Sequence, residues 1–305
     1  MLTFRPYPVC QHAHCFGWDY LIHKLYQNLA LGEGGIVLDD FVETYFWEID
    51  KKPHSSPWIG ILHYTPTAPT HLGGKTLEDL LKLEKFQESL KWCKLLVVLC
   101  HTTREFLLDK IAIPIKVVHM AKEAICNFSL DAYLENPTMF HAGHYLRSYA
   151  KYYYFNTDLK RILNICYPWH LEALSKDLAF HEVCPCDFKQ RVAVFNGFLP
   201  DSEYVELLRT RLSFCWLYDS GANNAVLESI VSHAPIVVNR ISPIVEYLGD
   251  DYPLYFDNIC HDPDRFLLNQ EILSKTILYL KNRSKYFTCD KFVEFFLSIK
   301  ASDLA

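Results

Sequence analysis

The sequence predicts an α/β protein made of two parallel sheets, each covered by helices. Short apolar runs alternate with amphipathic helical patterns along nearly the whole chain, which is typical of parallel sheets built from βα units. The 305 residues exceed the length at which a single hydrophobic core usually stops growing. The alternation falls into two series, joined by the segment NFSLDAYLENP within residues 122–137. We therefore expect domains at residues 1–121 and 122–285, followed by a C-terminal helix at 286–305.

The first series begins with a helical pattern that ends near Gly32, a residue that suits a helix C-terminus. A buried strand at 36–38 then delivers Asp39 and Asp40 at its end, and a strand in WIGILHYTP delivers His63. Further strands are expected in KLLVVLC and IKVVHM, each preceded by a helical pattern.

The second series has the same alternation. Strands are expected in TMFHAG, RILNI, VAVFNGFL, FCWLY, PIVVN and PLYF, and helices in HYLRSYAKYYYF, PWHLEALSKDLAF, SEYVELLRTR and SPIVEYLG. The first of these helices would carry Arg147, shortly after the glycine that ends the preceding strand. From Pro263 onward the pattern is helical.

Composition and charge exclude several classes of function. The formal net charge is −6 and the sequence has no basic stripe, whereas binding to a nucleic-acid backbone requires a basic face. No window has the apolar length of a membrane span, and the N-terminal residues lack the apolar core of a signal peptide. The eleven cysteines are scattered through apolar strand-like segments, which favours reduced thiols. We expect a cytoplasmic protein with no nucleic-acid partner.

The turn in DSGANNAVLESIVSHAP, residues 219–235, is the strongest candidate for a ligand site. Its small residues would let a ligand approach the backbone, and the first turn of the following helix offers unpaired N–H groups at the positive end of its dipole. These features suit an anion such as a diphosphate. Glu228, about one turn further along the helix, is placed to accept hydrogen bonds from ribose hydroxyls. The alternative is an ordinary βα turn with capping asparagines.

Four elements follow one another in a fixed order between residues 196 and 256. They are Gly197 with Phe198 and Leu199, the turn and helix at 222–228, the run APIVV at 234–238, and Glu246 in the next helix. This order resembles the donor-binding half of glycosyltransferases with the GT-B fold, particularly the large retaining family 4 and its viral and bacterial relatives. Gly143 and Arg147 are similar to the glycine-rich loop and the basic residue that this family places near the donor diphosphate.

The resemblance implies both a fold and a reaction. The fold would be GT-B, with an N-terminal acceptor domain and a C-terminal donor domain, both Rossmann-like, facing each other across a cleft that the last helix crosses. The reaction would transfer a hexose or pentose from a UDP- or GDP-sugar to a hydroxyl of a glycan or another acceptor. No D-x-D motif lies in a suitable loop, so we expect no metal cofactor. Arg147, the helix N-terminus and backbone amides would hold the diphosphate instead.

The nucleotide-sugar site that the resemblance implies draws on three loops. Its residues are Gly143 and Arg147 beside the diphosphate, Gly197, Phe198 and Leu199 against the nucleobase, and Ser220, Gly221, Ala222, Asn223, Asn224, Ala225 and Glu228 beside the diphosphate and ribose. One position departs from the family, whose usual pair of glutamates eight residues apart would place the first at position 220. Because that glutamate normally lies near the transferred sugar, Ser220 leaves the sugar and the stereochemical course open.

The groups that could act as a base lie in the first half. Asp39, Asp40 and His63 follow expected strands, and α/β sheets place their ligands at the carboxyl ends of strands. An inverting transfer needs such a group to take the acceptor's proton, whereas many retaining GT-B enzymes are thought to use the leaving phosphate. Asp40 is the first choice, because alternation turns it and Asp39 to opposite faces and the chain then continues with the polar Glu43, as expected of residues that line a cleft. Each of the three could instead be a helix cap or a hydrogen-bonded residue under a loop.

Three other functions remain as alternatives. Cysteines and histidines cluster in two places and would suit a zinc-binding interaction module; they are Cys10, His12, His14 and Cys15 in one place, and His181, Cys184 and Cys186 in the other. Neither spacing fits a common zinc module. The remaining alternatives are a sugar-nucleotide epimerase or hydrolase of the same fold and a nucleotide-binding module without catalytic activity. The sequence identifies neither the oligomeric state nor the acceptor.

Overall fold

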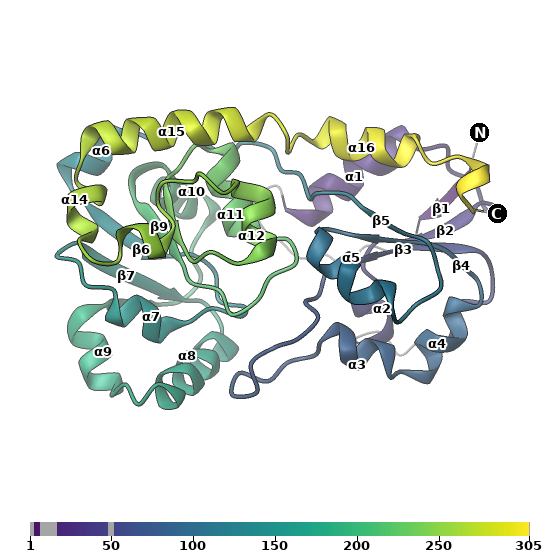
Figure 1. Ribbon diagram of the computed structural model, residues 1–305, viewed down its shortest axis with the longest axis horizontal. Coiled ribbons are helices and arrows are strands. Elements are labelled where there is room, and N and C mark those ends of the chain that lie inside the picture. Colours follow the sequence, from purple (N-terminus) through teal and green to yellow (C-terminus); the bar gives the residue numbers. More distant parts are fainter. Residues whose placement is uncertain (1–2, 7–16, 48–51, 305) are drawn as a thin grey trace.

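The computed structural model describes residues 3–6, 17–47 and 52–304 and contains two five-stranded parallel sheets. The strand order is β1-β2-β3-β4-β5 in the first sheet and β10-β9-β6-β7-β8 in the second. Figure 1 shows the two sheets next to each other along the long axis, with helices around each. The predicted α/β class with two parallel sheets is confirmed. The first sheet falls within residues 1–121 and the second within 122–285, while the exact domain boundary stays a prediction.

The first half places its strands between two layers of helices. Its strands are β1 (Phe4–Pro6), β2 (Ile36–Asp39), β3 (Trp58–Leu62), β4 (Cys93–Val98) and β5 (Ile115–Val117). Its helices are α1 (Trp18–Asn28), α2 (Val42–Trp47), α3 (Leu77–Leu81), α4 (Glu84–Leu90) and α5 (His101–Leu108). All five residues of β3 are buried, as expected of a central parallel strand. Ile59 and Ile61 belong to the core beneath α1, whereas Trp58 and Leu62 belong to the core beneath α2, α3 and α4.

The second half repeats this arrangement. Its strands are β6 (Thr138–His141), β7 (Lys160–Ile165), β8 (Ala193–Asn196), β9 (Leu212–Cys215) and β10 (Ile236–Val238). Its helices are α6 (Leu130–Glu135), α7 (Tyr149–Tyr154), α8 (Pro168–Phe180), α9 (Pro185–Arg191), α10 (Asp201–Thr210), α11 (Asn224–Val231), α12 (Ser242–Leu248), α13 (Phe256–Ile259), α14 (Pro263–Leu267) and α15 (Gln270–Ser284). Helix α15 packs on α11, α12 and α6.

The end of the chain returns to the first half. After α15 the chain enters α16 (Cys289–Leu297), which packs on α1, and then the short 3-10 helix η1 (Ala301–Leu304). Figure 1 shows α15 and α16 in yellow along one side of the molecule, spanning both halves. The rings of Trp18 and Phe292 lie 5.7 Å apart where α1 and α16 meet. The expected C-terminal helix that crosses back is therefore confirmed.

Several local expectations differ from the structure. Arg147 lies in a loop and not in a helix, because Leu146 has a positive φ of 54° and Ser148 caps α7, which begins only at Tyr149. The run PLYF forms no strand and makes a single bridge between Val238 and Tyr255 before α13 begins. Its apolar side chains reflect burial in the core and not a strand. Strand β1 and helix α9 had no clear sequence signal, and the long helical pattern before β4 is divided into α3 and α4.

The packing of α16 on α1 gives a test of stability. Phe292→Ala should lower the free energy of unfolding by about 3–5 kcal/mol, because the buried ring would leave a cavity between the two helices. Leu297→Ala, at an exposed position of the same helix, is the control and should change it by less than about 0.5 kcal/mol. Denaturant unfolding followed by tryptophan fluorescence measures both variants. Equal midpoints for both variants and the wild type would show that α16 does not hold the first half.

Candidate functional site

The loop after β6 folds back on β9 and places the guanidinium of Arg147 against Gly143. The N–H of Ala142 donates to the carbonyl of Phe214 at 2.9 Å, which fixes the start of the loop. Gly143 has a φ of +78°, and a Cβ at this position would lie 2.8 Å from Nη2 of Arg147. Only glycine combines this backbone conformation with the space that the guanidinium occupies. The expected proximity of Gly143 and Arg147 is therefore present in the structure.

Arg147 is a buried cation, with 7% of its surface exposed. Its Nε donates to the carbonyl of Ala142 at 3.2 Å, its Nη1 to the carbonyl of Tyr145, and its Nη2 to Oδ1 of Asn223 at 3.2 Å. Within the described part of the chain these hydrogen bonds go to carbonyl and amide oxygens, and none goes to a carboxylate. A buried charge without a counter-charge is costly, and the guanidinium has further N–H groups to donate. The position suits an anionic ligand.

The N-terminus of α11 meets this guanidinium. Asn223 is the N-cap of the helix, and its Oδ1 accepts from the N–H of Val226 at 3.2 Å as well as from Arg147. The amides of Asn224 and Ala225 lie in the first turn, where no preceding carbonyl of the helix is available. One side-chain oxygen thus joins the helix dipole and the buried cation. Two sources of positive potential converge at a single point.

The turn before α11 contacts the first half of the chain. A Cβ at Gly221 would lie 2.9 Å from the carbonyl oxygen of His63, so a larger residue would push the two halves apart. Ser220 is buried and Ala222 is half-buried. The N–H of Ser220 donates to Oδ1 of Asp219 at 2.7 Å. The structure therefore brings this turn and one of the predicted base candidates together.

The predicted nucleobase loop lies at the edge of the second sheet. Gly197 has a φ of +119°; its N–H donates to the carbonyl of Ile165 at 2.9 Å, and its carbonyl accepts from Nδ2 of Asn164 at 3.3 Å. Phe198 is 70% exposed, and Leu199 is half-buried. The loop follows β8, which is separated from β6 by β7. It therefore shares the carboxyl edge of the sheet with Arg147 without contacting it directly.

Glu228 differs from the expectation that its carboxylate faces an open ribose site. It is 4% exposed, its Oε1 lies 2.5 Å from Nζ of the buried Lys122, and its Oε2 accepts from the hydroxyl of Tyr204. Both oxygens are therefore engaged by the protein itself. Through Lys122, Glu228 joins α11 to the segment that connects the two halves, in addition to any contact with a ligand.

Lys122 and Tyr204 are the partners of Glu228, and the sequence analysis did not single them out. Lys122 was visible as a lysine that follows the apolar run before the junction, but its partner lies 106 residues away. Tyr204 lies in α10 and gives no sequence signal that separates it from other tyrosines. Such pairings depend on how the junction packs against α11.

Asp39 belongs to the core of the first half. Its Oδ2 lies 3.0 Å from Nε2 of His54, and both side chains are buried. The ring of His54 is stacked between Tyr45, at 4.3 Å, and Trp58, at 4.7 Å. Asp39 thus fixes a histidine inside an aromatic cluster, on the opposite side of β2 from Asp40, as strand alternation requires.

Asp40 and His63 lie next to each other at the ends of β2 and β3. Nε2 of His63 is 3.0 Å from the carbonyl oxygen of Asp40; because a carbonyl only accepts, Nε2 carries the proton and Nδ1 has the lone pair. Burial lowers the pKa of His63 to about 4. Burial, and then the charge of Asp39, raises the pKa of Asp40 to about 7. Oδ2 of Asp40 is buried and makes no hydrogen bond within the described residues.

Glu43 is a further carboxyl group at this place. It lies in the first turn of α2, is fully buried, and accepts from the N–H groups of His63 at 2.7 Å and Tyr64 at 2.8 Å through Oε1. The sequence indicated it only as a polar residue, three positions after Asp40, that could line a cleft, and gave it no further role. Three ionisable groups therefore surround the turn that contacts Gly221.

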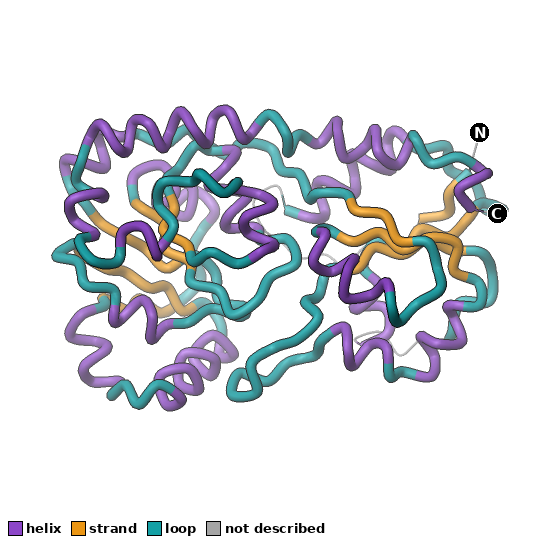
Figure 2. The backbone as a smooth tube through the Cα atoms, in the orientation of Figure 1, coloured by secondary structure: helices purple, strands orange, loops and turns teal. Residues whose placement is uncertain are grey.

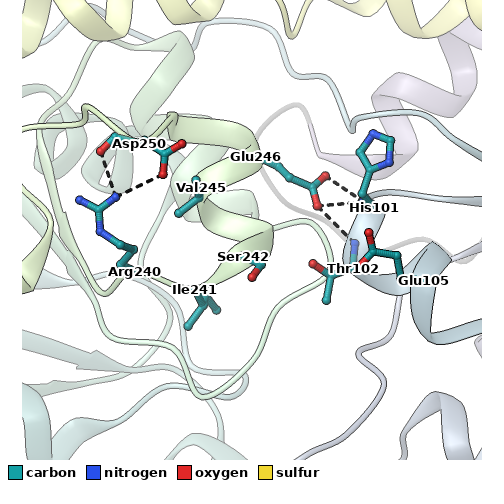
Figure 3. A pocket seen from close by; sticks show the side chains of 9 residues that line it. All are labelled: His101, Thr102, Glu105, Arg240, Ile241, Ser242, Val245, Glu246 and Asp250. Atoms are coloured by element: carbon teal, nitrogen blue, oxygen red, sulfur yellow. Dashed lines mark hydrogen bonds and ion pairs between the residues drawn. The ribbon is translucent and has the colours of Figure 1, made fainter.

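A second contact between the halves joins α12 to α5. Glu246 accepts from the N–H of His101 at 2.8 and 2.9 Å and from that of Thr102 at 3.3 Å, while Nε2 of His119 lies 3.3 Å from its Oε2. Figure 3 shows this carboxylate reaching across to the N-terminus of α5. The contact closes one side of a cavity of about 640 Å³ that is lined by both halves, through His101, Thr102, Glu105, Arg240, Ile241, Ser242, Val245, Glu246 and Asp250.

The long loop between β3 and α3 makes a third contact. Figure 2 shows this loop extending from the first half toward the second. Nε2 of His71 lies 3.3 Å from Oδ1 of the buried Asp177 in α8, and the His71 ring stacks on Phe180 at 4.0 Å. This contact is a further polar link between the two halves.

The zinc-binding alternative finds no ligand cluster within the described ranges. No group of three or more histidine, cysteine and acidic side chains there could hold a metal ion. His181 lies 2.7 Å from the hydroxyl of Tyr218 through Nε2, while Cys184 and Cys186 are exposed. The other group, Cys10, His12, His14 and Cys15, lies outside the described residues. Among the helices that the structure describes, none is long and apolar enough to cross a membrane.

The buried pair of Glu228 and Lys122 gives a second test. Glu228→Ala should lower the free energy of unfolding by about 3–5 kcal/mol, because it leaves the Lys122 ammonium buried without a partner. The double variant Lys122→Met with Glu228→Leu should recover most of this loss. Arg209→Ala, which breaks an exposed pair with Glu206, is the control and should cost less than about 1 kcal/mol. Denaturant unfolding measures all three, and a Glu228→Ala protein as stable as the wild type would contradict the buried pair.

Comparison with known proteins identifies the fold. The sequence matches no protein-family profile and no curated protein. Its structure is similar to sucrose-phosphate synthase from Thermosynechococcus elongatus, with a TM-score of 0.66 and 10% identity over 86% of this chain and 71% of that one. It is also similar to the trehalose-6-phosphate synthase OtsA, with a TM-score of 0.61 and 13% identity over 92% and 76%. HepE from Anabaena, in complex with UDP and glucose, has a TM-score of 0.58 and 10% identity over 80% and 72%. The chain therefore has the GT-B fold that these glycosyltransferases share.

Proposed function

We propose that the protein is a glycosyltransferase that transfers a sugar from a UDP- or GDP-sugar to a hydroxyl of a glycan or another acceptor. The observation that carries the proposal is the buried guanidinium of Arg147, which lies at the N-terminus of α11 without a carboxylate partner among the described residues. A diphosphate would supply the missing counter-charge. Solved structures with this fold include HepE with UDP and glucose and an E. coli protein bound to UDP-2-fluoro glucose, which supports a UDP-sugar as donor.

The donor half would act on the leaving group. As the bond to the sugar breaks, negative charge builds up on the diphosphate, and preorganised positive groups stabilise it most effectively. Arg147 and the first-turn amides of Asn224 and Ala225 have this arrangement. Because they supply positive charge at this position, we propose that the reaction needs no metal ion. The exposed ring of Phe198 is available to cover the nucleobase.

The first half would present the acceptor. Asp40 and His63 lie next to each other at strand ends, and the carbonyl of His63 contacts the turn at Gly221, whereas Asp39 is held by His54 and is left out of the proposed machinery. An acceptor hydroxyl must lose a proton as it attacks. Asp40, with a pKa of about 7, would take it when ionised; Nδ1 of His63, with a pKa of about 4, is the second candidate.

Nucleotide affinity tests the role of Arg147. Arg147→Ala should weaken UDP binding about ten- to a hundredfold, because charge-assisted hydrogen bonds contribute roughly 1.5–3 kcal/mol, while the much weaker binding of uridine should not change. Arg147→Lys keeps the positive charge but lacks the planar, two-pronged guanidinium, so its affinity for UDP should lie between those of the wild type and Arg147→Ala. Arg209→Ala, far from the site on the surface of α10, is the control. The measurement is calorimetry in EDTA, after melting curves confirm folding. Wild-type affinity in Arg147→Ala, or binding that requires a divalent ion, would contradict the assignment.

The pH dependence of transfer distinguishes the two base candidates. A base works only when deprotonated, so with Asp40 as base kcat/KM should fall as the pH drops below about 7; with His63 as base it should fall only below about 4. We expect the first result, and a loss of roughly 10²–10⁴-fold in turnover for Asp40→Asn. The anomeric configuration of the product, measured by NMR, completes the test. Retention of configuration, with Asp40→Asn and His63→Ala near wild-type turnover, would leave both residues structural. Release of free sugar without any acceptor product would instead assign the site to a hydrolase.

A further inference from the structure

We propose that Glu43 is a positioning residue for sugar transfer, which holds the turn after β3 so that His63 faces the donor turn at Gly221. The proposal rests on the proposed function and adds a residue to its machinery. Glu43 lies in the first turn of α2, and the resemblance to known glycosyltransferases carries no residue onto this position.

The first observation is the hydrogen bonding of Glu43. Its side chain is fully buried, and its Oε1 accepts from two consecutive backbone amides, those of His63 at 2.7 Å and Tyr64 at 2.8 Å. Two bonds to one oxygen fix two successive peptide groups as the chain leaves β3. Burying a carboxyl group is costly, and the two hydrogen bonds from the backbone offset part of that cost.

The second observation is what this turn touches. The carbonyl of His63 is the atom that a Cβ at Gly221 would meet at 2.9 Å, and Nε2 of His63 is 3.0 Å from the carbonyl of Asp40. The ring of Tyr64 lies 6.0 Å from that of Tyr145, in the loop that carries the guanidinium. The turn therefore meets both donor loops. A small displacement of this turn would therefore move the acceptor side relative to the donor site, although Glu43 itself need not contact the nucleotide.

The third observation is the free oxygen of Glu43. Its Oε2 is buried and makes no hydrogen bond within the described residues. The ionisable groups that face Glu43 are Asp39 at the end of β2, whose charge disfavours its ionisation, His63 on the turn, and Tyr145, whose pKa the charge of Glu43 raises. Burial is the largest effect and raises the pKa of Glu43 to about 7, against the two amide hydrogen bonds. The carboxyl group is therefore neutral below pH 7 and becomes a buried charge above it.

Two substitutions distinguish a positioning role of Glu43 from a purely structural role and from a role in proton transfer. Glu43→Gln keeps an oxygen that accepts from both amides but cannot ionise, and Glu43→Ala removes the acceptor. We expect Glu43→Ala to lower kcat about ten- to a hundredfold, because small misplacements of reacting groups have effects of this size. Glu43→Gln should stay within about threefold of the wild type, and both variants should keep the wild-type Kd for UDP. Thr44→Val, at a buried position in the same helix, is the control and should leave kcat unchanged.

Stability provides a readout that does not depend on turnover. The pKa of Glu43 is about 4.5 in the unfolded chain and about 7 in the folded protein. Between these two pH values the unfolded chain ionises first, so the folded protein becomes less stable as the pH rises. The melting temperature of Glu43→Gln should therefore rise relative to the wild type over this interval and stay level above it. If the alanine variant fails to fold, Glu43→Asp replaces it and should give an intermediate kcat, since its shorter side chain reaches the amides less well.

Each outcome decides the proposal. Glu43→Gln as inactive as Glu43→Ala would show that the carboxyl group itself transfers a proton. Glu43→Ala with wild-type kcat would reduce the residue to scaffold, and a changed UDP Kd would place it in the donor site. The wild-type protein tests the proposed function separately. If it binds UDP but turns over no nucleotide sugar, both the proposed function and the role of Glu43 are overturned. If it does turn over a nucleotide sugar, the variants test the role of Glu43 alone.

Discussion

The hydrogen bond between the guanidinium of Arg147 and the side chain of Asn223 is the interaction on which the candidate site depends. It joins the loop after β6 to the N-terminus of α11, and it does so with a buried cation that has no carboxylate partner in the described chain. The rest of the local structure follows from accommodating this group. Gly143 must lack a side chain to leave room for the guanidinium, and Asn223 must serve at once as helix cap and as acceptor. Burying the guanidinium without a carboxylate partner destabilises the folded protein, and an anionic ligand would offset this cost.

Polar groups join the two halves of the chain at this edge. Glu228 pairs with Lys122 at the junction, Glu246 caps α5 from α12, and His71 lies against Asp177. Each of these places a carboxylate of the second half against a donor from the first half or from the junction. The turn at Gly221 is a further contact between the halves, with the carbonyl of His63 against it. Relative movement of the halves must therefore break specific hydrogen bonds.

Much of the fold could be predicted from the sequence, because parallel strands and their helices have strong local patterns. The buried strands β2, β3, β4, β6, β7 and β9 coincide with apolar runs, and α8 has the expected bounds. The expectations that differ share one cause, which is packing between distant segments. PLYF is apolar because it fills the core beside α15, and Arg147 leaves the helix because its side chain must reach Asn223, 76 residues away.

The candidate site could be predicted in part. The resemblance to GT-B glycosyltransferases implied that Gly143, Arg147 and the N-terminus of α11 lie at one diphosphate site, and the structure places these residues in contact. The partners of the carboxyl groups could not be predicted, since His54, Lys122 and the amides that bind Glu43 are brought in by tertiary contacts. Asp39 and Asp40 are adjacent in sequence, yet one is paired in the core and the other lies beside His63.

The central claim is that a nucleotide diphosphate binds at Arg147 and the N-terminus of α11. A crystal structure of the protein with UDP tests this claim most directly. We expect the phosphate oxygens within hydrogen-bond distance of the guanidinium and of the amides of Asn224 and Ala225, with the base toward Gly197. Electron density for UDP at another place, with Arg147 still bound only to protein oxygens, would contradict the account.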